Sequence, residues 1–463
     1  MKSSRRQFIA GTLAAGAALP FVSRVQAAAA NAFAEPPKGL KVAGEFDLIV
    51  AGGGPAGFAA AVTAARMGRK VMLFEAHGAL GGIWTTGLLG CIIDFGRADL
   101  SREIIRHLDR FGARQPRRKT MLDSNFTYEP EAMKVILEGI AMSSGVNFRY
   151  HSPVVAAYRD ASGRNIETVV TESKSGRQAW RAKIFMDCTG DGDLAAFAGC
   201  GYDEGGLKPG SPAQPASLVA VVTVADDSRI RKFTINDPDG FDAEGVPLGE
   251  PKKLLYDELV AAGFEPSYAR PTLFRIHKNL FALMANQEYD IKVDDCAGIT
   301  AATVRARREI FEIVATLTKK DPKTWEGLRI VATAEQLGHR TARRVHGRYT
   351  MTGDDVREGR RFPDAVASSS FGVDIHAVTR QENREKPTYS TFEAKEDLDP
   401  YQEMPLYQIP LRACRAKDAD NLYMAGRCIS GDFVSQASYR VTGPAVQMGE
   451  GVVRRIFGDG TDV

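Results

Sequence analysis

Residues 46–75 constrain the fold of this chain more than any other stretch. An apolar run leads into Gly52-x-Gly54-x-x-Gly57, an alanine-rich segment follows, and a second apolar run closes the stretch. This order is typical of a strand, a phosphate-binding turn, a helix and a second strand. Gly52 permits the tight turn, Gly54 lets the backbone approach a pyrophosphate, and Gly57 lets the helix pack on the strand. We therefore predict an α/β fold with a dinucleotide at the start of this helix.

Glu75 ends the second apolar run about 20 residues after the glycines, where a carboxylate accepts the ribose hydroxyls of an adenosine. The alternative is a glycine-rich turn in an ordinary α/β protein. The strand before the turn, the helix after it and the acid about 20 residues further on together favour a dinucleotide site. The spacing does not by itself separate FAD from NAD. The predicted binding residues of this stretch are Gly52, Gly54, Pro55, Ala56, Gly57 and Glu75.

Three later stretches add further glycine-rich turns. They read AHGALGGIWTTGLLG at 76–90, MDCTGDGDL at 186–194 and NLYMAGRCISGDFVSQASYRVTGPAVQMGEGV at 421–452. Together with the first motif, they resemble the FAD-dependent oxidoreductases of the glutathione-reductase-2 flavoprotein superfamily, and most of all the family called simply FAD-dependent oxidoreductase. The resemblance covers nearly all of the chain after residue 27. It implies an FAD-binding Rossmann-like domain with a parallel sheet and a small antiparallel layer, plus an inserted α+β substrate domain.

The resemblance also implies further contacts with FAD. In relatives the residue at Val154 meets the adenine through its backbone, and the helix that begins near Thr442 points its N-terminus at the pyrimidine edge of the flavin. That placement suits an anionic reduced flavin. The FAD is expected to be non-covalent, because loop 81–90, where succinate-dehydrogenase-like relatives attach flavin, contains no histidine. The additional implied residues are Gly81, Gly82, Val154, Gly190, Asp191, Gly426, Arg427, Thr442 and Gly443.

The expected domains follow from the same resemblance. The FAD-binding domain is discontinuous, and two inserted regions form the substrate side. The predicted ranges are 45–95, 125–205 and 411–463 for the FAD-binding domain, 96–124 and 206–410 for the inserted regions, 28–44 for a linker and 1–27 for a signal segment.

The first 27 residues read as an export signal. Two arginines, Arg5 and Arg6, stand in SRRQFI, and an apolar run at 8–19 leads to a small-residue cleavage site at 25–27. The run is shorter than the roughly 20 residues of a transmembrane helix. We predict export by the Tat pathway to the periplasm, with the Tat translocon as a transient partner. The alternative is a basic tail with a chance arginine pair.

Charge and cysteine content exclude several classes of function. The chain has 60 basic and 57 acidic residues, and removing 1–27, with four basic and no acidic residues, leaves 56 against 57. This balance argues against a nucleic-acid or polybasic membrane surface. Six cysteines occur without a CxxC pair, so neither a zinc nor an iron–sulfur framework is indicated, and no metal site is predicted.

The catalytic residues are predicted from the chemistry that a hydride transfer needs, namely an acid–base group and a polar clamp. Among seven histidines we assign acid–base chemistry to His376, near Asp374, with a structural hydrogen bond to Asp374 as the alternative. Arg340 is predicted to orient an anionic or hydroxylated substrate, and its alternative is a solvated face of a basic helix within 328–352. Arg440, just before the last helix, is predicted to clamp the substrate or stabilise reduced flavin.

The predicted function is an exported FAD-dependent oxidoreductase that moves a hydride between a small organic substrate and flavin N5. The chain shows no second dinucleotide motif, so we expect a respiratory electron donor or acceptor rather than NAD(P)H. Two alternatives remain open: a redox-inactive flavoprotein that acts as a binding or assembly module, and an FAD monooxygenase. The sequence does not identify the substrate.

Overall fold

The computed structural model describes residues 33, 35–36, 39–116, 123–208, 210–235, 249–385, 388–389 and 405–458. The predicted signal segment at 1–27 lies outside the described residues. One compact unit begins at Lys41 and contains all the secondary structure given below. The predicted linker is wrong at its end, because strand β1 (Val42–Ala51) already begins at Val42.

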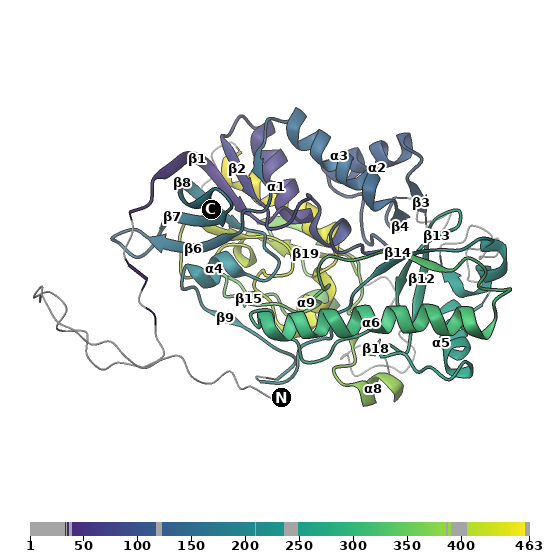
Figure 1. Ribbon diagram of the computed structural model, residues 1–463. Helices are drawn as coiled ribbons and strands as arrows, with labels where there is room; N and C mark the ends of the chain where they lie inside the picture. Colours follow the sequence, from purple (N-terminus) through teal and green to yellow (C-terminus); the bar gives the residue numbers. More distant parts are fainter. Residues whose placement is uncertain are drawn as a thin grey trace, which may run out of the picture. The chain divides into compact units, whose positions relative to one another are not determined.

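A seven-stranded sheet forms the centre of the first core (Figure 1). Its strands β5, β2, β1, β8 and β20 run parallel, and β7 and β6 continue the sheet antiparallel from β8. The α/β fold class with a parallel sheet and a small antiparallel layer is therefore confirmed. The further strands are β2 (Val71–Phe74), β5 (Asn147–Arg149), β6 (Val154–Arg159), β7 (Ile166–Ser173), β8 (Gly176–Asp187) and β20 (Leu422–Met424).

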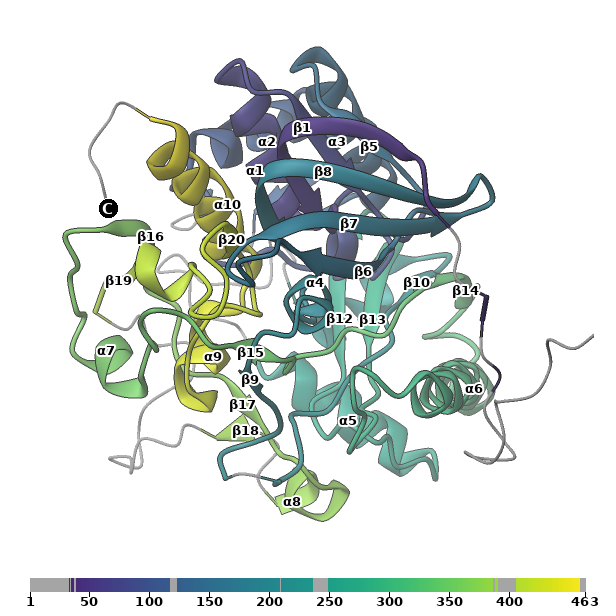
Figure 2. The same ribbon diagram turned by 90° about the vertical axis from the view of Figure 1, so that its left-hand side faces the viewer.

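Helix α1 (Pro55–Arg66) directly follows β1 and is almost entirely buried. Its face is made of small residues, Ala59, Ala60 and Ala61 among them, so it can lie close to its neighbours. The last helix, α10, runs alongside it, and Figure 2 shows α10 near α1 and the parallel strands. The other helices of this core are α2 (Asp99–Arg110), α3 (Pro130–Ser143), α4 (Asp193–Phe197), α7 (Gly353–Arg357), α9 (Phe433–Tyr439) and α10 (Thr442–Phe457).

A second hydrophobic core surrounds a five-stranded sheet in the order β11-β12-β13-β10-β14. The long helix α6 lies near this sheet and buries Ala302, Ala306, Ile310, Ile313 and Leu317, which recur at helical spacing (Figure 1). Its elements are β10 (Ala220–Thr223), β11 (Thr234–Ile235), β12 (Thr272–His277), β13 (Leu280–Met284), β14 (Arg329–Thr333), α5 (Pro251–Ala261) and α6 (Cys296–Lys320).

The two cores divide the chain differently from the predicted domains. Helix α2 falls in a predicted inserted region, yet it buries Ile104 and Leu108 in the first core, because its apolar stripe needs cover. Val345 and Tyr407, which both fall within the larger predicted insertion, also belong to the first core. Short elements complete this part: β9 (Tyr202–Asp203) with β15 (Arg344–Val345), β16 (Ala365–Ser369) with β19 (Tyr407–Pro410), β17 (Ile375–His376) with β18 (Thr388–Tyr389), β3 (Arg114–Pro116) with β4 (Phe126–Tyr128), and α8 (Arg380–Glu385).

The basic helix expected within 328–352 is wrong. Residues 338–343 form no helix, and the strand β14 precedes them. The buried arginines donate instead to backbone carbonyls of separate loops: Arg340 to Pro215, Arg343 to Asp191 and Arg344 to Gly205. An extended segment can send neighbouring side chains in different directions, which one face of a helix cannot do.

Candidate active site

A first cavity lies where β1, β2 and β8 end, at the carboxyl edge of the parallel sheet. This is the place where open α/β sheets bind ligands. It gathers residues from all the predicted glycine-rich turns. Of the fifteen predicted cofactor residues, those that line it are Gly52, Gly54, Pro55, Ala56, Glu75, Gly82, Val154, Gly190, Asp191, Gly426, Arg427 and Thr442.

The glycines of the first turn have distinct roles. Gly52 has a φ of +94°, and a Cβ there would lie 2.4 Å from the Cys188 carbonyl oxygen. A Cβ on Gly57 would lie 1.9 Å from the Gly52 carbonyl oxygen. A Cβ on Gly54 would meet nothing within 4 Å, although Gly54 lines the cavity. Thus Gly52 and Gly57 allow close packing, whereas Gly54 leaves room for a ligand against the backbone.

Two helices begin at this cavity without a side-chain cap. The N-cap residues of α1 and α10 are Gly54 and Val441, and neither helix carries an acid in its first turn. Their free N–H groups and partial positive charge suit an anionic ligand. The buried Nε atoms of Arg427 and Arg440, both on the cavity wall, also have no hydrogen-bond partner among the described residues. These features fit a bound dinucleotide.

Three predicted cofactor residues do not line the first cavity: Gly57, Gly81 and Gly443. Gly81 donates its N–H to the Gly53 carbonyl oxygen over 2.8 Å. A Cβ on Gly443 would lie 1.8 Å from the Asp94 carbonyl oxygen, so Gly443 lets the start of α10 pack against that loop. These three glycines do not face the first cavity, but their close packing positions the segments that line it.

Glu75 lines the first cavity and is 5% exposed. Its Oε2 accepts the Gly53 N–H over 2.6 Å, and its Oε1 accepts the His77 N–H over 2.8 Å. The carboxylate therefore holds the glycine turn in place, and its remaining lone pairs are available to a ribose.

Replacing Glu75 with alanine should weaken FAD binding about tenfold or more. The change removes charge-assisted hydrogen bonds worth about 1.5–3 kcal/mol, and it also frees the Gly53 N–H. Titration of the apoprotein with FAD measures the affinity, and Glu131→Ala on exposed α3 surface is the control. An unchanged affinity in Glu75→Ala would show that Glu75 does not contact the cofactor.

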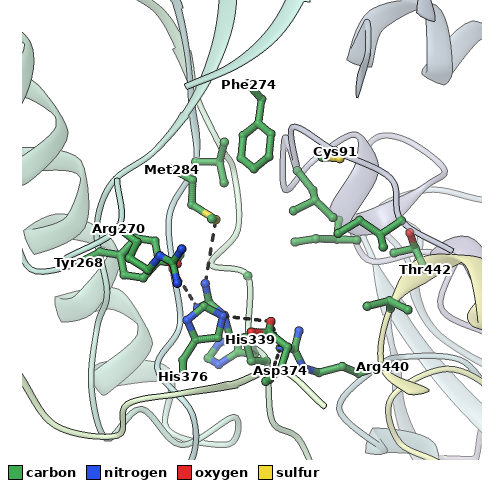
Figure 3. A pocket seen from close by; sticks show the side chains of 18 of the residues that line it. Cys91, Tyr268, Arg270, Phe274, Met284, His339, Asp374, His376, Arg440 and Thr442 are labelled. Atoms are coloured by element: carbon green, nitrogen blue, oxygen red, sulfur yellow. Dashed lines mark hydrogen bonds and ion pairs between the residues drawn. The ribbon is translucent and has the colours of Figure 1, made fainter. Parts of the chain in front are cut away.

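A second cavity adjoins the first and lies between the two cores. The residues that line both cavities are Ile83, His339, Arg427, Arg440 and Thr442. The rest of the wall is largely apolar, and Figure 3 shows Phe274 and Met284 at one end and Asp374, His376 and Arg440 at the other. The shared wall joins the two cavities into one site.

Asp374 is the charged centre of the polar end (Figure 3). Its Oδ2 lies 3.1 Å from Arg440 Nη2 and 3.3 Å from His376 Nε2. Burial opposes ionisation of Asp374, but His376, Arg440 and Arg340 outweigh it and hold its pKa well below the usual range. Arg440, predicted as a clamp, is thus held by an acid at the junction of the two cavities.

His376 is buried, and both of its ring nitrogens have partners. Nδ1 lies 3.0 Å from Gln287 Nε2, and Nε2 lies 3.3 Å from Asp374 Oδ2. Burial, followed by the nearby Arg340 guanidinium, lowers the pKa of His376 to about 4, although Asp374 acts in the opposite direction. The ring is therefore neutral at neutral pH, with Nδ1 accepting from Gln287 and Nε2 donating to Asp374. This geometry agrees with the structural alternative for His376, and its predicted acid–base role has no free nitrogen to use.

Arg340 is 8% exposed and lines the second cavity. Its Nη1 donates to the Pro215 carbonyl oxygen over 2.6 Å and to Ser217 Oγ over 2.9 Å. Its Nη2 contacts the Met284 sulfur at 4.0 Å. The predicted alternative, a solvated helix face, is wrong, because the residue is buried and 338–343 form no helix.

His339 is a site residue that the sequence analysis missed. It stands at the junction of the cavities, and burial lowers its pKa. Its ring makes no hydrogen bond with any described residue. We selected its neighbour Arg340 because it is charged and lies in a basic stretch. No motif or spacing around His339 predicts a functional role.

Replacing Asp374 with alanine should cost about 3 kcal/mol of folding free energy. It would leave Arg440 and the His376 N–H without their acceptor in a largely desolvated place, and Asp374 is 25% exposed, so the loss falls at the lower end for buried pairs. Urea unfolding measures the change. Asp257→Ala, which breaks an exposed pair with Lys253, should cost at most about 0.5 kcal/mol. Equal losses in both variants would mean that Asp374 does not neutralise the site.

Within the described ranges, no group of three or more histidine, cysteine or acidic residues could hold a metal ion. In the same part of the chain, no helix is long and apolar enough to cross a membrane.

Comparison with known proteins places this site in a family. The family model described as FAD dependent oxidoreductase matches residues 47–453. The mitochondrial dihydrolipoyl dehydrogenase of Schizosaccharomyces pombe is 26% identical over 254 residues, which are 54% of this chain and 46% of that protein. The chain thus matches less than half the length of this relative.

This chain is also similar to the following two solved structures. A geranylgeranyl bacteriochlorophyll reductase-like protein from Thermoplasma acidophilum is 11% identical, with a TM-score of 0.45, over 89% of this chain and 78% of its own. A flavin-dependent brominase is 9% identical, with a TM-score of 0.45, over 90% and 80% of the two chains.

Proposed function

The chain belongs to the FAD dependent oxidoreductase family, and we propose that it moves a hydride between a small organic substrate and flavin N5. FAD, when bound, supplies the two-electron redox centre for this chemistry. The first cavity is proposed to hold FAD, and the second to hold the substrate. One observation carries the proposal: the two cavities share Ile83, Arg440 and Thr442, so their contents can meet.

The residues around the second cavity perform three tasks in this proposal. The apolar wall, which includes Phe274 and Ile93, excludes water from the reacting groups. Arg440 stands where charge changes during the reaction, and Asp374 fixes its position. His376 holds Asp374 through Nε2–H, so we assign it a positioning role.

We assign the acid–base role to His339 instead of His376. A hydride that leaves a C–H bond next to a hydroxyl or amine leaves a proton to be accepted. His339 lines both cavities, and its lowered pKa keeps the ring neutral, with a lone pair to accept that proton.

An anaerobic screen of purified yellow protein tests the proposal. A donor substrate should bleach the oxidised flavin band, and air or an added electron acceptor should restore it. The site would fail as a redox site if dithionite bleached the flavin but no member of a broad metabolite pool did so, and a binding or assembly role would then be favoured. Bleaching by NAD(P)H followed by substrate hydroxylation would favour a monooxygenase.

We also propose that the protein is exported by the Tat pathway to the periplasm, where a respiratory partner would exchange electrons with it. The support is the twin arginine of SRRQFI, followed by an apolar run and a small-residue cleavage site. Arg5→Lys combined with Arg6→Lys should keep the FAD-loaded protein in the cytoplasm. Fractionation of cells measures this, and continued export of the double variant would show that another route is used.

A further inference from the structure

We propose that the second cavity binds organic monocarboxylates with an apolar body, and that the carboxylate pairs with Arg340. This inference rests on the proposed function in calling such a molecule a substrate. The carboxylate binding itself stands on the cavity, on the partners of Arg340 and on the charge of the wall.

Arg340 is a buried cation, and no buried anion among the described residues pairs with it. Its guanidinium donates to two oxygens, the Pro215 carbonyl and Ser217 Oγ, and both are neutral. Among the described residues, Arg340 has no carboxylate partner within ion-pair distance. A buried charge without a counter-ion is costly, so a guanidinium in this state is suited to receive an anion.

The two other arginines at the junction of the cavities already have a carboxylate partner. Arg440 pairs with Asp374 at 3.1 Å, and Arg427 pairs with Asp191 at 2.5 Å. Asp374 lies close enough to influence Arg340, but its recorded ion pairs are with Arg440 and His376. A ligand anion would therefore meet its strongest unpaired partner at Arg340.

Nη2 of Arg340 is directed to the Met284 sulfur, which is a weak acceptor, at 4.0 Å. A carboxylate that reached Nη2 would replace this contact with a charge-assisted hydrogen bond. The planar guanidinium favours a carboxylate, whose two oxygens match its fork.

The charge and polarity of the wall complete the ligand's description. The described part of the wall contains five basic side chains, Lys252, Arg270, Arg340, Arg427 and Arg440, and one acid, Asp374. Away from this polar end it presents side chains such as Phe274, Val219 and Ile93. One acid group with an apolar chain or ring therefore matches the cavity better than a sugar or a dication does.

The test compares fatty monocarboxylates of four to eight carbons with their primary amides, bound to the oxidised holoprotein. Calorimetry and the shift of the flavin spectrum measure binding. The carboxylates should bind at least about tenfold more tightly than the amides, and each added methylene should gain about three- to fourfold until the wall is filled. Equal affinity for acid and amide would overturn the proposal.

Two variants at Met284 test the role of Arg340 without deleting it. Met284→Glu should place a carboxylate beside Nη2 and abolish the preference for acids, whereas Met284→Gln should retain it. Arg340→Gln should also lose the preference, with Arg308→Gln on the exposed face of α6 as its control. A preference for acids that survives both Met284→Glu and Arg340→Gln would refute the assignment.

The binding and bleaching experiments distinguish a failure of the carboxylate site from a failure of the proposed hydride transfer. Tight carboxylate binding without flavin bleaching by any donor would count against hydride transfer and support the carboxylate site. Bleaching by neutral donors, with no preference for acids in binding, would support hydride transfer and overturn the carboxylate site.

Discussion

Gly57→Ala should reduce the affinity for FAD by about a hundredfold or more. The new methyl group would lie 1.9 Å from the Gly52 carbonyl oxygen, and its second neighbour, Cys188 Cβ, is 3.0 Å away. Overpacking of a core typically costs up to about 3 kcal/mol, and here the clash is with backbone, which cannot rotate aside. Helix α1 would have to move off β1, and its N-terminus would leave the cavity that it lines.

Gly139→Ala is the matched control for this prediction. Gly139 also lies in a helix, α3, but a Cβ there would meet nothing within 4 Å. This substitution should stabilise the protein by up to about 1 kcal/mol and leave FAD binding unchanged. FAD titration and thermal unfolding of both variants provide the measurements. If Gly57→Ala bound FAD as the parent does, the turn would not have the packing role that we give it.

His339→Asn should slow flavin reduction by substrate about 10²- to 10⁴-fold, the usual contribution of a general base. In the parent enzyme, the rate should rise with pH through a pKa below the ordinary value of histidine, because burial lowers the pKa of His339 and the neutral ring is the active form. Rapid-mixing measurements of flavin bleaching at several pH values provide both readings. The variant should lose this pH dependence.

His376→Asn discriminates between the two histidines. Its effect should be smaller than that of His339→Asn, because His376 acts through Asp374 and both ring nitrogens are occupied. Both variants must first be shown to retain FAD and to be bleached by dithionite. If His376→Asn slowed reduction by substrate far more than His339→Asn did, the sequence-based assignment would be right and ours would be wrong.

The cofactor side of the site could be predicted from the sequence because its signals are local. The strand, turn and helix order around Gly54 and the spacing to Glu75 place both residues at one edge of the sheet, and the family resemblance added Gly190. The buried residues of α3, Met133, Ile136, Leu137 and Ile140, likewise recur at helical spacing, which is a local pattern. In these cases the local structure depends on residues that are close together in the sequence.

The substrate side could not be predicted in the same way, because it depends on contacts between distant segments. Arg340 is buried through Pro215 and Ser217, more than 100 positions earlier in the chain, and this contact overrides the helical pattern. His376 owes its neutral state to burial and to Arg340, neither of which spacing reveals. The charged residues that we singled out from the sequence, Arg340, His376 and Arg440, line the second cavity, but the sequence could not say which of them had partners.

Leu89→Trp tests the central claim most directly, namely that the second cavity holds the reacting substrate beside FAD. Leu89 lines the second cavity but not the first, and it is partly exposed, so a larger side chain should fill the cavity and spare the cofactor. The measurement is anaerobic flavin bleaching in the FAD-loaded variant. We predict that dithionite will bleach the flavin as in the parent while substrate will no longer do so. Bleaching by substrate at the parent rate would contradict the account.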